Sequence, residues 1–132
     1  MTIGISQVLI MRSVIESVLI YAKVCHPKEG ILLLRGKAKK DVIEVSEVMI
    51  PPLSVRSKSF SFFSAHLLPM DFSIVGIAHS HPSGILAPSV EDLNNFYGRI
   101  MIIAAFPYDS KSNIIVIDGK GRTLNYEIVN GE

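Results

Sequence analysis

The segment HSHPSGILAPSVED, residues 79–92, constrains the fold more than any other part of this sequence. It follows directly on an apolar segment, Ser73 to His79, whose composition is typical of a buried β-strand. Side chains on a strand alternate in direction, so His79 and His81 project to the same side. The strand is therefore expected to end in a pair of imidazoles that can bind one metal ion together.

A helix start follows the two histidines after a short connection. Pro88 precedes Ser89, Asp92 stands three residues after the serine, and we predict a helix from Ser89 to Tyr97. Two interpretations of Asp92 are open. A serine followed three residues later by an acidic residue is typical of a capped helix and needs no metal. Because the connection is short, the first helical turn must also lie near the strand end, where an Asp92 oxygen can complete a set of two nitrogens and one oxygen.

The rest of the chain predicts one further helix and several strands. Apolar residues at helical spacing favour a helix from Ser13 to about Cys25, which Pro27 ends. The predicted strands are Gly30–Leu34, Val42–Ile50, Ser59–Ala65, Ser73–His79, Ile100–Phe106, Ile114–Ile117 and Thr123–Val129. The segments GKAKKD, PYDSKSN and DGKGR are expected to be turns. This pattern predicts an α/β fold, a mixed β-sheet sandwiched by helices, in a single domain over residues 1–132.

Composition excludes several classes of partner. Thirteen Lys plus Arg against twelve Asp plus Glu give a net charge of +1, so no overall field draws the protein to nucleic acid or to a membrane. No apolar run approaches the ~18 residues of a membrane span, and the N-terminal residues lack the pattern of a secretory signal.

Cys25 is the sole cysteine, which excludes an internal disulfide and a zinc site built from several thiolates. We expect a cytoplasmic protein.

The predicted ligand set, three protein groups with one open position, is typical of a catalytic zinc ion, where the pKa of water falls to ~7. Attack by that water requires a general base that is near the metal without binding it. Asp71, Glu91, Asp109 and Asp118 fall in loops or on a helix surface. Glu29 instead stands at the start of an apolar strand, where a charge needs a reason. A solvated strand end would explain Glu29 by itself, but together with the histidine pair we interpret it as the base.

Two segments, HPKEGILLLRG around Glu29 and HSHP followed by S-x-x-D, resemble the JAMM or MPN-type metalloproteases. The resemblance extends from the first helix to the final hairpin and points to the small stand-alone archaeal members. It implies the JAMM/MPN fold, which is cytidine-deaminase-like. It also implies one Zn²⁺ per chain, bound by His79, His81 and Asp92 with water as the fourth ligand. Glu29 would then activate the water and pass its proton to the leaving amine, and Ser89 would donate a hydrogen bond to the oxyanion.

The activity that the resemblance implies is hydrolysis of an isopeptide bond between the C-terminal glycine of a ubiquitin-like modifier and a target lysine. Two alternatives are open: a catalytically silent MPN-type scaffold module, and a peptidase that processes sulfur-carrier proteins. Nucleic-acid deamination, which also uses zinc and a glutamate, is disfavoured because the sequence has no P-C-x-x-C pair. The expected partners are ubiquitin-like or sulfur-carrier-type modifier proteins and their conjugates.

A modifier tail can dock by adding itself as an extended strand to a sheet edge, which we expect within residues 53–65. Phe60, Phe62 and Phe63 can contribute to a patch for the body of the modifier, although core-facing aromatics are the simpler explanation. A docking edge for the modifier tail is therefore expected in this segment.

Linkage selectivity is not expected. Asp92 is followed by a short helix and then by Ile100, without the insertion that the resemblance associates with eukaryotic members selective for particular polyubiquitin chains. His26 and His66 are interpreted as surface or loop residues rather than ligands.

Overall fold

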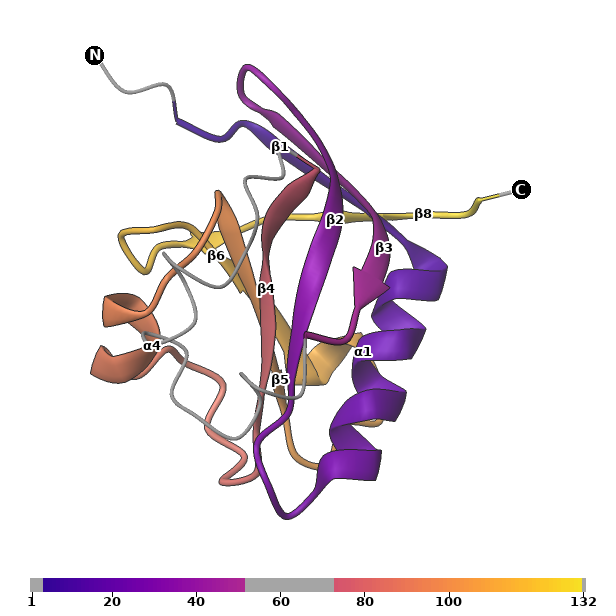
Figure 1. Ribbon diagram of the computed structural model, residues 1–132, viewed down its shortest axis with the longest axis vertical. Coiled ribbons are helices and arrows are strands. Elements are labelled where there is room, and N and C mark those ends of the chain that lie inside the picture. Colours follow the sequence, from indigo (N-terminus) through magenta and orange to yellow (C-terminus); the bar gives the residue numbers. More distant parts are fainter. Residues whose placement is uncertain (1–3, 52–72, 132) are drawn as a thin grey trace.

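The computed structural model describes residues 4–51 and 73–131, and the strands among them form one mixed sheet with a helix on each face (Figure 1). The helices are α1 (Arg12–Cys25) and α4 (Val90–Asn94), with a 3-10 turn η1 (Lys111–Asn113). The strands are β1 (Gln7–Met11), β2 (Ile31–Lys39), β3 (Val42–Met49), β4 (Ile74–His81), β5 (Ile100–Ala105), β6 (Ile114–Ile117), β7 (Thr123–Leu124) and β8 (Glu127–Val129). Their order in the sheet is β7-β6-β5-β4-β2-β3-β1-β8. The predicted class, α/β with a mixed sheet between helices, is confirmed.

Helix α1 covers one face of the sheet with an apolar stripe. Val14, Ile15, Val18 and Ala22 are its buried residues, and they belong to a core that takes in side chains from β1 to β6. Burying a Val or Ile side chain contributes roughly 1.5–3 kcal/mol, so this stripe explains why the helix docks where it does. The helix starts one residue before the predicted Ser13 and ends at the predicted Cys25.

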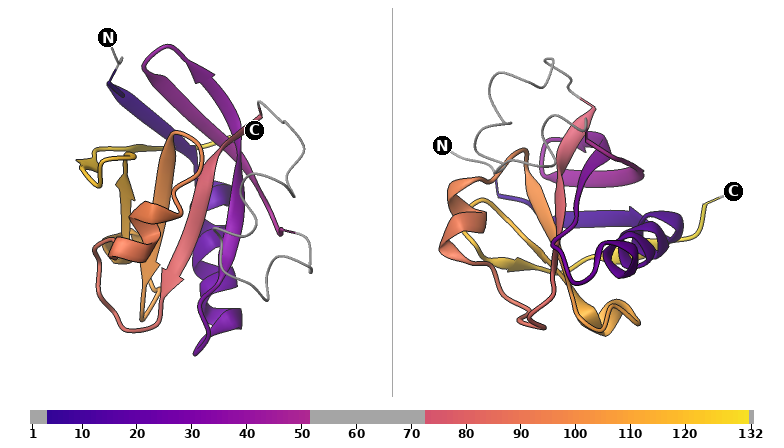
Figure 2. Two further views of the ribbon diagram at one scale, coloured as in Figure 1. Left: turned by 60° about the vertical axis from the view of Figure 1, so that its left-hand side comes forward. Right: turned by 60° about the horizontal axis from the view of Figure 1, so that its bottom comes forward.

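The opposite face of the sheet carries a second core beneath α4. Its fully buried members include Leu33, Met101, Ile103 and Ile117, and Leu93 of α4 packs against them. Figure 2 shows α1 and α4 on opposite sides of the sheet. The sheet is therefore buried on both faces, which accounts for the nearly continuous apolar sequence of β4 and β5.

Helix α4 is shorter than the predicted helix, since it ends at Asn94 rather than at Tyr97. Asn94 and Asn95 have low helix propensity, and Gly98 takes a left-handed φ of +82° that turns the chain away. Phe96 lies outside the helix and still packs on the second core.

Strand β4 is the element that positions the histidine pair. It is antiparallel to β2 and parallel to β5, and every residue from Ile74 to Ser80 is buried. It begins one residue after the predicted Ser73 and runs two residues past the predicted end, so His79 and His81 both lie within the strand.

The hairpin between β2 and β3 differs from the prediction. Residues Gly36 to Lys39, expected in a turn, continue β2, and the turn itself is Lys40 and Asp41, with Lys40 at a φ of 55°. The predicted ends of β3, β5 and β6 agree with the structure to within one residue. The DGKGR turn is confirmed, because the Asp118 N–H donates to the Arg122 carbonyl there.

The predicted strand Thr123–Val129 is wrong as a single element. Its first part, β7, pairs with β6 at one edge of the sheet, and its last part, β8, pairs with β1 at the other edge. Only Asn125 and Tyr126 separate them, a span of about 10 Å, so the sheet must curl until its two edges approach each other.

Strand β1 is an element that the sequence reasoning did not predict. It runs directly into α1 without a linker, and its apolar residues merge with those of the helix. It lies between β3 and β8 and is parallel to both.

Several expectations lie outside the described residues. These are the strand Ser59–Ala65, the sheet edge within residues 53–65, the loop residues Asp71 and His66, and the patch of Phe60, Phe62 and Phe63. Within residues 4–51 and 73–131, no helix is long and apolar enough to cross a membrane.

Candidate metal centre

The two histidines of β4 occupy the end of the strand on the face that α4 covers. His79 pairs with Ile31 of β2 and with Ile103 of β5, so its backbone is fixed on both sides. Its side chain is 5% exposed and that of His81 is 11% exposed. Two nearly buried imidazoles at the end of a central strand are held by the sheet rather than by a flexible loop.

Helix α4 brings Asp92 to the histidines through a capping box. The Asp92 N–H donates to Ser89 Oγ over 3.0 Å, and the Ser89 N–H donates to Asp92 Oδ2 over 2.9 Å. Asp92 is 5% exposed, whereas Ser89 is exposed. The two interpretations of Asp92 made from the sequence therefore coexist, because one carboxylate both caps the helix and faces the strand.

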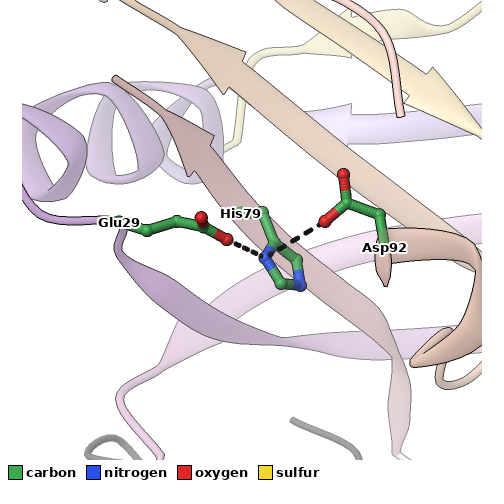
Figure 3. Close-up of side chains that lie close together, drawn as sticks. All are labelled: Glu29, His79 and Asp92. Carbon is green, nitrogen blue, oxygen red and sulfur yellow. Dashed lines mark hydrogen bonds and ion pairs between the residues drawn. The ribbon is translucent and has the colours of Figure 1, made fainter. Parts of the chain in front are cut away.

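The carboxylates of Asp92 and Glu29 converge on the histidine pair from two sides. His81 Nε2 lies 3.0 Å from Asp92 Oδ2, and His79 Nδ1 lies 3.8 Å from Asp92 Oδ1. Glu29 Oε1 lies 3.0 Å from His79 Nδ1 (Figure 3). Ligand atoms of Glu29, His79 and Asp92 all lie within 4.8 Å of one another. Three segments that are distant in the sequence thus meet at one point.

The donor set fits a zinc ion. Two imidazole nitrogens and one carboxylate oxygen are typical zinc ligands, and bonds of about 2.0–2.1 Å to a tetrahedral ion separate its ligand atoms by about 3.3 Å. The two histidines face different oxygens of Asp92, His81 Nε2 at 3.0 Å from Oδ2 and His79 Nδ1 at 3.8 Å from Oδ1, so both rings lie near this separation from the carboxylate. A metal site formed by these residues agrees with the structure.

A backbone contact prepares His81 for a metal. Its Nδ1 lies 2.9 Å from the Ile85 carbonyl, which can only accept, so Nδ1 carries the proton. With the proton of the neutral ring on Nδ1, Nε2 has the lone pair that a cation needs. The connection between β4 and α4 therefore sets the tautomer as well as the distance.

Charges in the site move two pKa values in opposite directions. Burial by itself raises the pKa of Asp92, but hydrogen bonds from His81 and from the Ser89 backbone, together with the charges of both histidines, lower it to about 2. The hydrogen bond to Asp92 raises the pKa of His81 above 6.5, against the opposing effect of burial. In the absence of a metal, His81 and Asp92 thus favour an ion pair.

Glu29 differs from the other carboxylates that the sequence offered as bases. It lies in the loop between α1 and β2, with a side chain that is 50% exposed beside a histidine that is almost buried. Asp118 is held in its turn by Arg122, Asp109 pairs with Lys23, and Glu91 is exposed on α4. Glu29 is the one of these four that contacts a histidine of the pair.

Two residues near the site were not assigned a role from the sequence. His26, interpreted as a surface residue, is exposed, but its Nδ1 lies 3.0 Å from the Tyr108 hydroxyl and its ring stacks on Phe106. Ser80, between the two histidines, accepts a hydrogen bond from the Gly30 N–H. Neither contact has a local sequence signature, because each joins residues that are distant in the chain.

Comparisons with known proteins agree on one family. The family model of prokaryotic homologues of the JAB domain matches residues 11–120. A curated relative from Haloferax volcanii, a probable metalloprotease, is 40% identical over 90 residues, or 63% of this chain and 56% of that protein. The chain thus spans little more than half the length of that relative.

Two solved structures share the fold over almost the whole chain. One is a JAMM structure that represents a metalloprotease-like zinc site in the proteasome and signalosome. It has a TM-score of 0.66 and 31% identity. The other, a JAB1/MPN domain protein from Archaeoglobus fulgidus, has a TM-score of 0.68 and 31% identity. Each match covers 95% of this chain and 100% of the other.

Proposed function

This chain belongs to the family of prokaryotic homologues of the JAB domain, the JAMM or MPN type, and from that premise we propose that it is a zinc-dependent isopeptidase. The bond that it hydrolyses joins the C-terminal glycine of a ubiquitin-like modifier to a lysine side chain. The observation that carries the proposal is the contact of 3.0 Å between Glu29 and His79, which places a half-exposed carboxylate beside the predicted ligands.

In this proposal His79, His81 and Asp92 hold the zinc ion. When bound, zinc supplies a Lewis acid that polarises a carbonyl and lowers the pKa of water. The backbone of β4 and the capping box of α4 keep these three side chains in place before substrate arrives. Little rearrangement is then needed when the substrate binds, which is the condition for preorganised catalysis.

Glu29 moves the proton in this proposal. Its carboxylate is exposed enough to meet a water molecule and close enough to His79 to stay at the site. It accepts a proton from the attacking water and then donates that proton to the lysine amine as the isopeptide bond breaks. A base and acid of this kind contributes about 10²- to 10⁴-fold in rate.

Ser89 stabilises the charge that develops on the scissile carbonyl oxygen. Its oxygen accepts from the Asp92 N–H, so the hydroxyl hydrogen is available to donate to substrate. The side chain is exposed at the start of α4, next to the same Asp92 that faces the histidines. Loss of such a donor typically lowers the rate by about 10²- to 10³-fold.

The test is a cleavage assay with matched variants. A panel of ubiquitin-like modifiers, each joined through its C-terminal glycine to the lysine of a fluorescent peptide, is incubated with wild type, Glu29→Gln and His79→Ala. We expect wild type to contain about one zinc per chain, Glu29→Gln to keep the zinc and lose about 10²- to 10⁴-fold in rate, and His79→Ala to lose both.

Glu91→Gln is the control, since Glu91 carries the same charge next to Asp92 but is exposed outside the site. It should cleave like wild type, and a chelator should stop cleavage in both. Cleavage that persists in Glu29→Gln would remove Glu29 as the base. Zinc binding without turnover of any conjugate would favour a scaffold module, and release of a short extension from a sulfur-carrier protein, seen by mass spectrometry, would favour the peptidase.

A further inference from the structure

Ser80 lies between the two histidines of β4 and points to the other face of the sheet. It is 3% exposed and lines a small cavity of about 10 Å³ together with Gly30 and with residues of α1 such as Tyr21. Its hydroxyl cannot reach the metal centre from that side, so the ligand set does not explain a buried polar residue here.

Two hydrogen bonds join Ser80 to Gly30. The Ser80 N–H donates to the Gly30 carbonyl over 3.0 Å, and the Gly30 N–H donates to Ser80 Oγ over 2.7 Å. In a continued antiparallel ladder, the Gly30 N–H would donate to the carbonyl of Ser80 instead. The hydroxyl therefore replaces the next rung of the ladder, and β2 begins only at Ile31, which pairs with His79.

This replacement occurs at the residue that follows the base. Glu29 is half exposed, so packing around its side chain does not fix its position. The position of its carboxylate must come mainly from its backbone, and the next residue of that backbone is tied to Ser80. A carboxylate held in this way reaches His79 over 3.0 Å (Figure 3).

The other side of Gly30 is closed by the end of α1. A Cβ at position 30 would lie 3.1 Å from Cys25 Sγ and 3.2 Å from the Tyr21 ring. The backbone after Glu29 is thus confined between α1 and β4, with the Ser80 hydroxyl as its buried polar anchor.

We propose that Ser80 is a positioning residue for Glu29: by taking the Gly30 N–H on its hydroxyl, it ends the β2–β4 ladder at the point that directs the Glu29 carboxylate toward His79. This inference rests on the function proposed above for Glu29. In this proposal Ser80, the middle residue of the H-S-H segment, positions the general base Glu29 and does not bind the metal.

The experiment compares Ser80→Ala, which removes the hydroxyl, with Ser80→Thr, which keeps it. Ser46→Ala is the control, because the Ser46 hydroxyl also bonds the β2 backbone, at Arg35 and away from the site. Four measurements are made on wild type and the three variants. They are steady-state cleavage of the fluorescent isopeptide conjugates, zinc content, thermal melting, and amide hydrogen exchange of Gly30 by NMR.

We expect Ser80→Ala to stay folded, to keep its zinc and its KM, and to lose about 10- to 100-fold in kcat, as displacement of a catalytic group by about 1 Å does. The Gly30 amide should exchange at least about tenfold faster in Ser80→Ala, since its buried acceptor is gone. Ser80→Thr should restore slow exchange and most of kcat, and Ser46→Ala should match wild type.

A folded Ser80→Ala variant with the kcat of wild type would overturn the proposal, and so would one whose Gly30 amide stays protected. Loss of zinc together with activity would assign Ser80 to the histidines and also overturn it. If wild type cleaves no conjugate, the proposed function fails. The exchange of the Gly30 amide in Ser80→Ala and Ser80→Thr then still decides whether Ser80 anchors this backbone.

Discussion

The carboxylate of Asp92 caps a helix and also faces the histidine pair. Its Oδ2 accepts the Ser89 N–H and also faces His81 Nε2 over 3.0 Å. The cap fixes where the carboxylate stands, because the helix start and the oxygen are linked through the backbone. The helix cap therefore also holds this carboxylate toward the histidine pair.

The ion pair of His81 and Asp92 predicts how the stability of the metal-free protein depends on pH. The pKa of His81 is raised above 6.5, so its contribution is complete below pH 6.5 and is lost as the pH rises through the folded pKa. The pKa of Asp92 falls from 3.8 to about 2, so its contribution is present above pH 3.8 and is lost as the pH falls toward 2. Urea unfolding of zinc-free wild type, measured from about pH 2 to a pH above the folded pKa of His81, should show both losses in the free energy of unfolding.

Asp92→Asn is the matched variant for this measurement. An asparagine can still accept the Ser89 N–H at the helix start, but it carries no charge for His81. The free energy of unfolding of this variant should vary less with pH than that of wild type. Identical pH profiles of the two proteins would contradict the role of the ion pair.

Individual site residues differ in how far the sequence reveals them. The spacing of His79, His81 and Asp92 predicts that they lie together, since strand alternation and a short connection bring them to one place. The role of Ser80 could not be predicted in this way, because its partner is the backbone N–H of Gly30, fifty positions earlier. A hydrogen bond to a distant backbone group leaves no pattern in the sequence.

Among the elements, strand β4 sets the position of the histidine pair. Gly76 pairs with Ile100 of β5, and a Cβ at Gly76 would stand 2.0 Å from the Ile100 carbonyl oxygen. An added methyl must therefore push two central strands apart, because backbone atoms cannot rotate away as a flexible side chain can.

Gly76→Ala should lower the free energy of unfolding by about 3 kcal/mol or more, measured by chemical denaturation, because the whole pair of strands must shift. Gly4→Ala is the control, since a Cβ at Gly4 has nothing within 4 Å. It should change stability very little. A Gly76→Ala protein as stable as Gly4→Ala would show that the strands separate without cost.

Elements were predictable from sequence where a buried apolar run is bounded by turns, and less so where polar residues continue a strand, as in β2, or where one segment divides between two edges. Strands β4, β5 and β6 are buried apolar runs bounded by turns, and their bounds follow from that pattern. Residues 123–129 alternate as one strand, yet they divide between two edges because the partners of each part lie elsewhere in the chain. Alternation indicates a strand, but it does not indicate which strand is next to it.

The candidate metal centre joins three parts of the folded chain. Glu29 precedes β2, the histidines end β4, and Asp92 lies in the first turn of α4. Such a site exists only in the folded state, so an ion bound there stabilises the fold by mass action.

Zinc at about a hundredfold excess over its Kd should add about 2.7 kcal/mol to the free energy of unfolding. For a domain of this size that corresponds to a rise in Tm of roughly 10 °C over chelator-treated protein. Differential scanning fluorimetry with zinc and with chelator measures it. His79→Ala should melt at the same temperature in both conditions, and a wild type that does the same would contradict a folded-state metal site.

The parallel pairing of β1 with β8 has a consequence for biosynthesis. Leu9 to Met11 are in register with Glu127 to Val129, so β1 lacks one of its two neighbours until residues near 129 have left the ribosome. Contacts of such long sequence separation slow folding. The nascent protein should therefore remain sensitive to proteases until residues near 129 have left the ribosome, and then become resistant in one step.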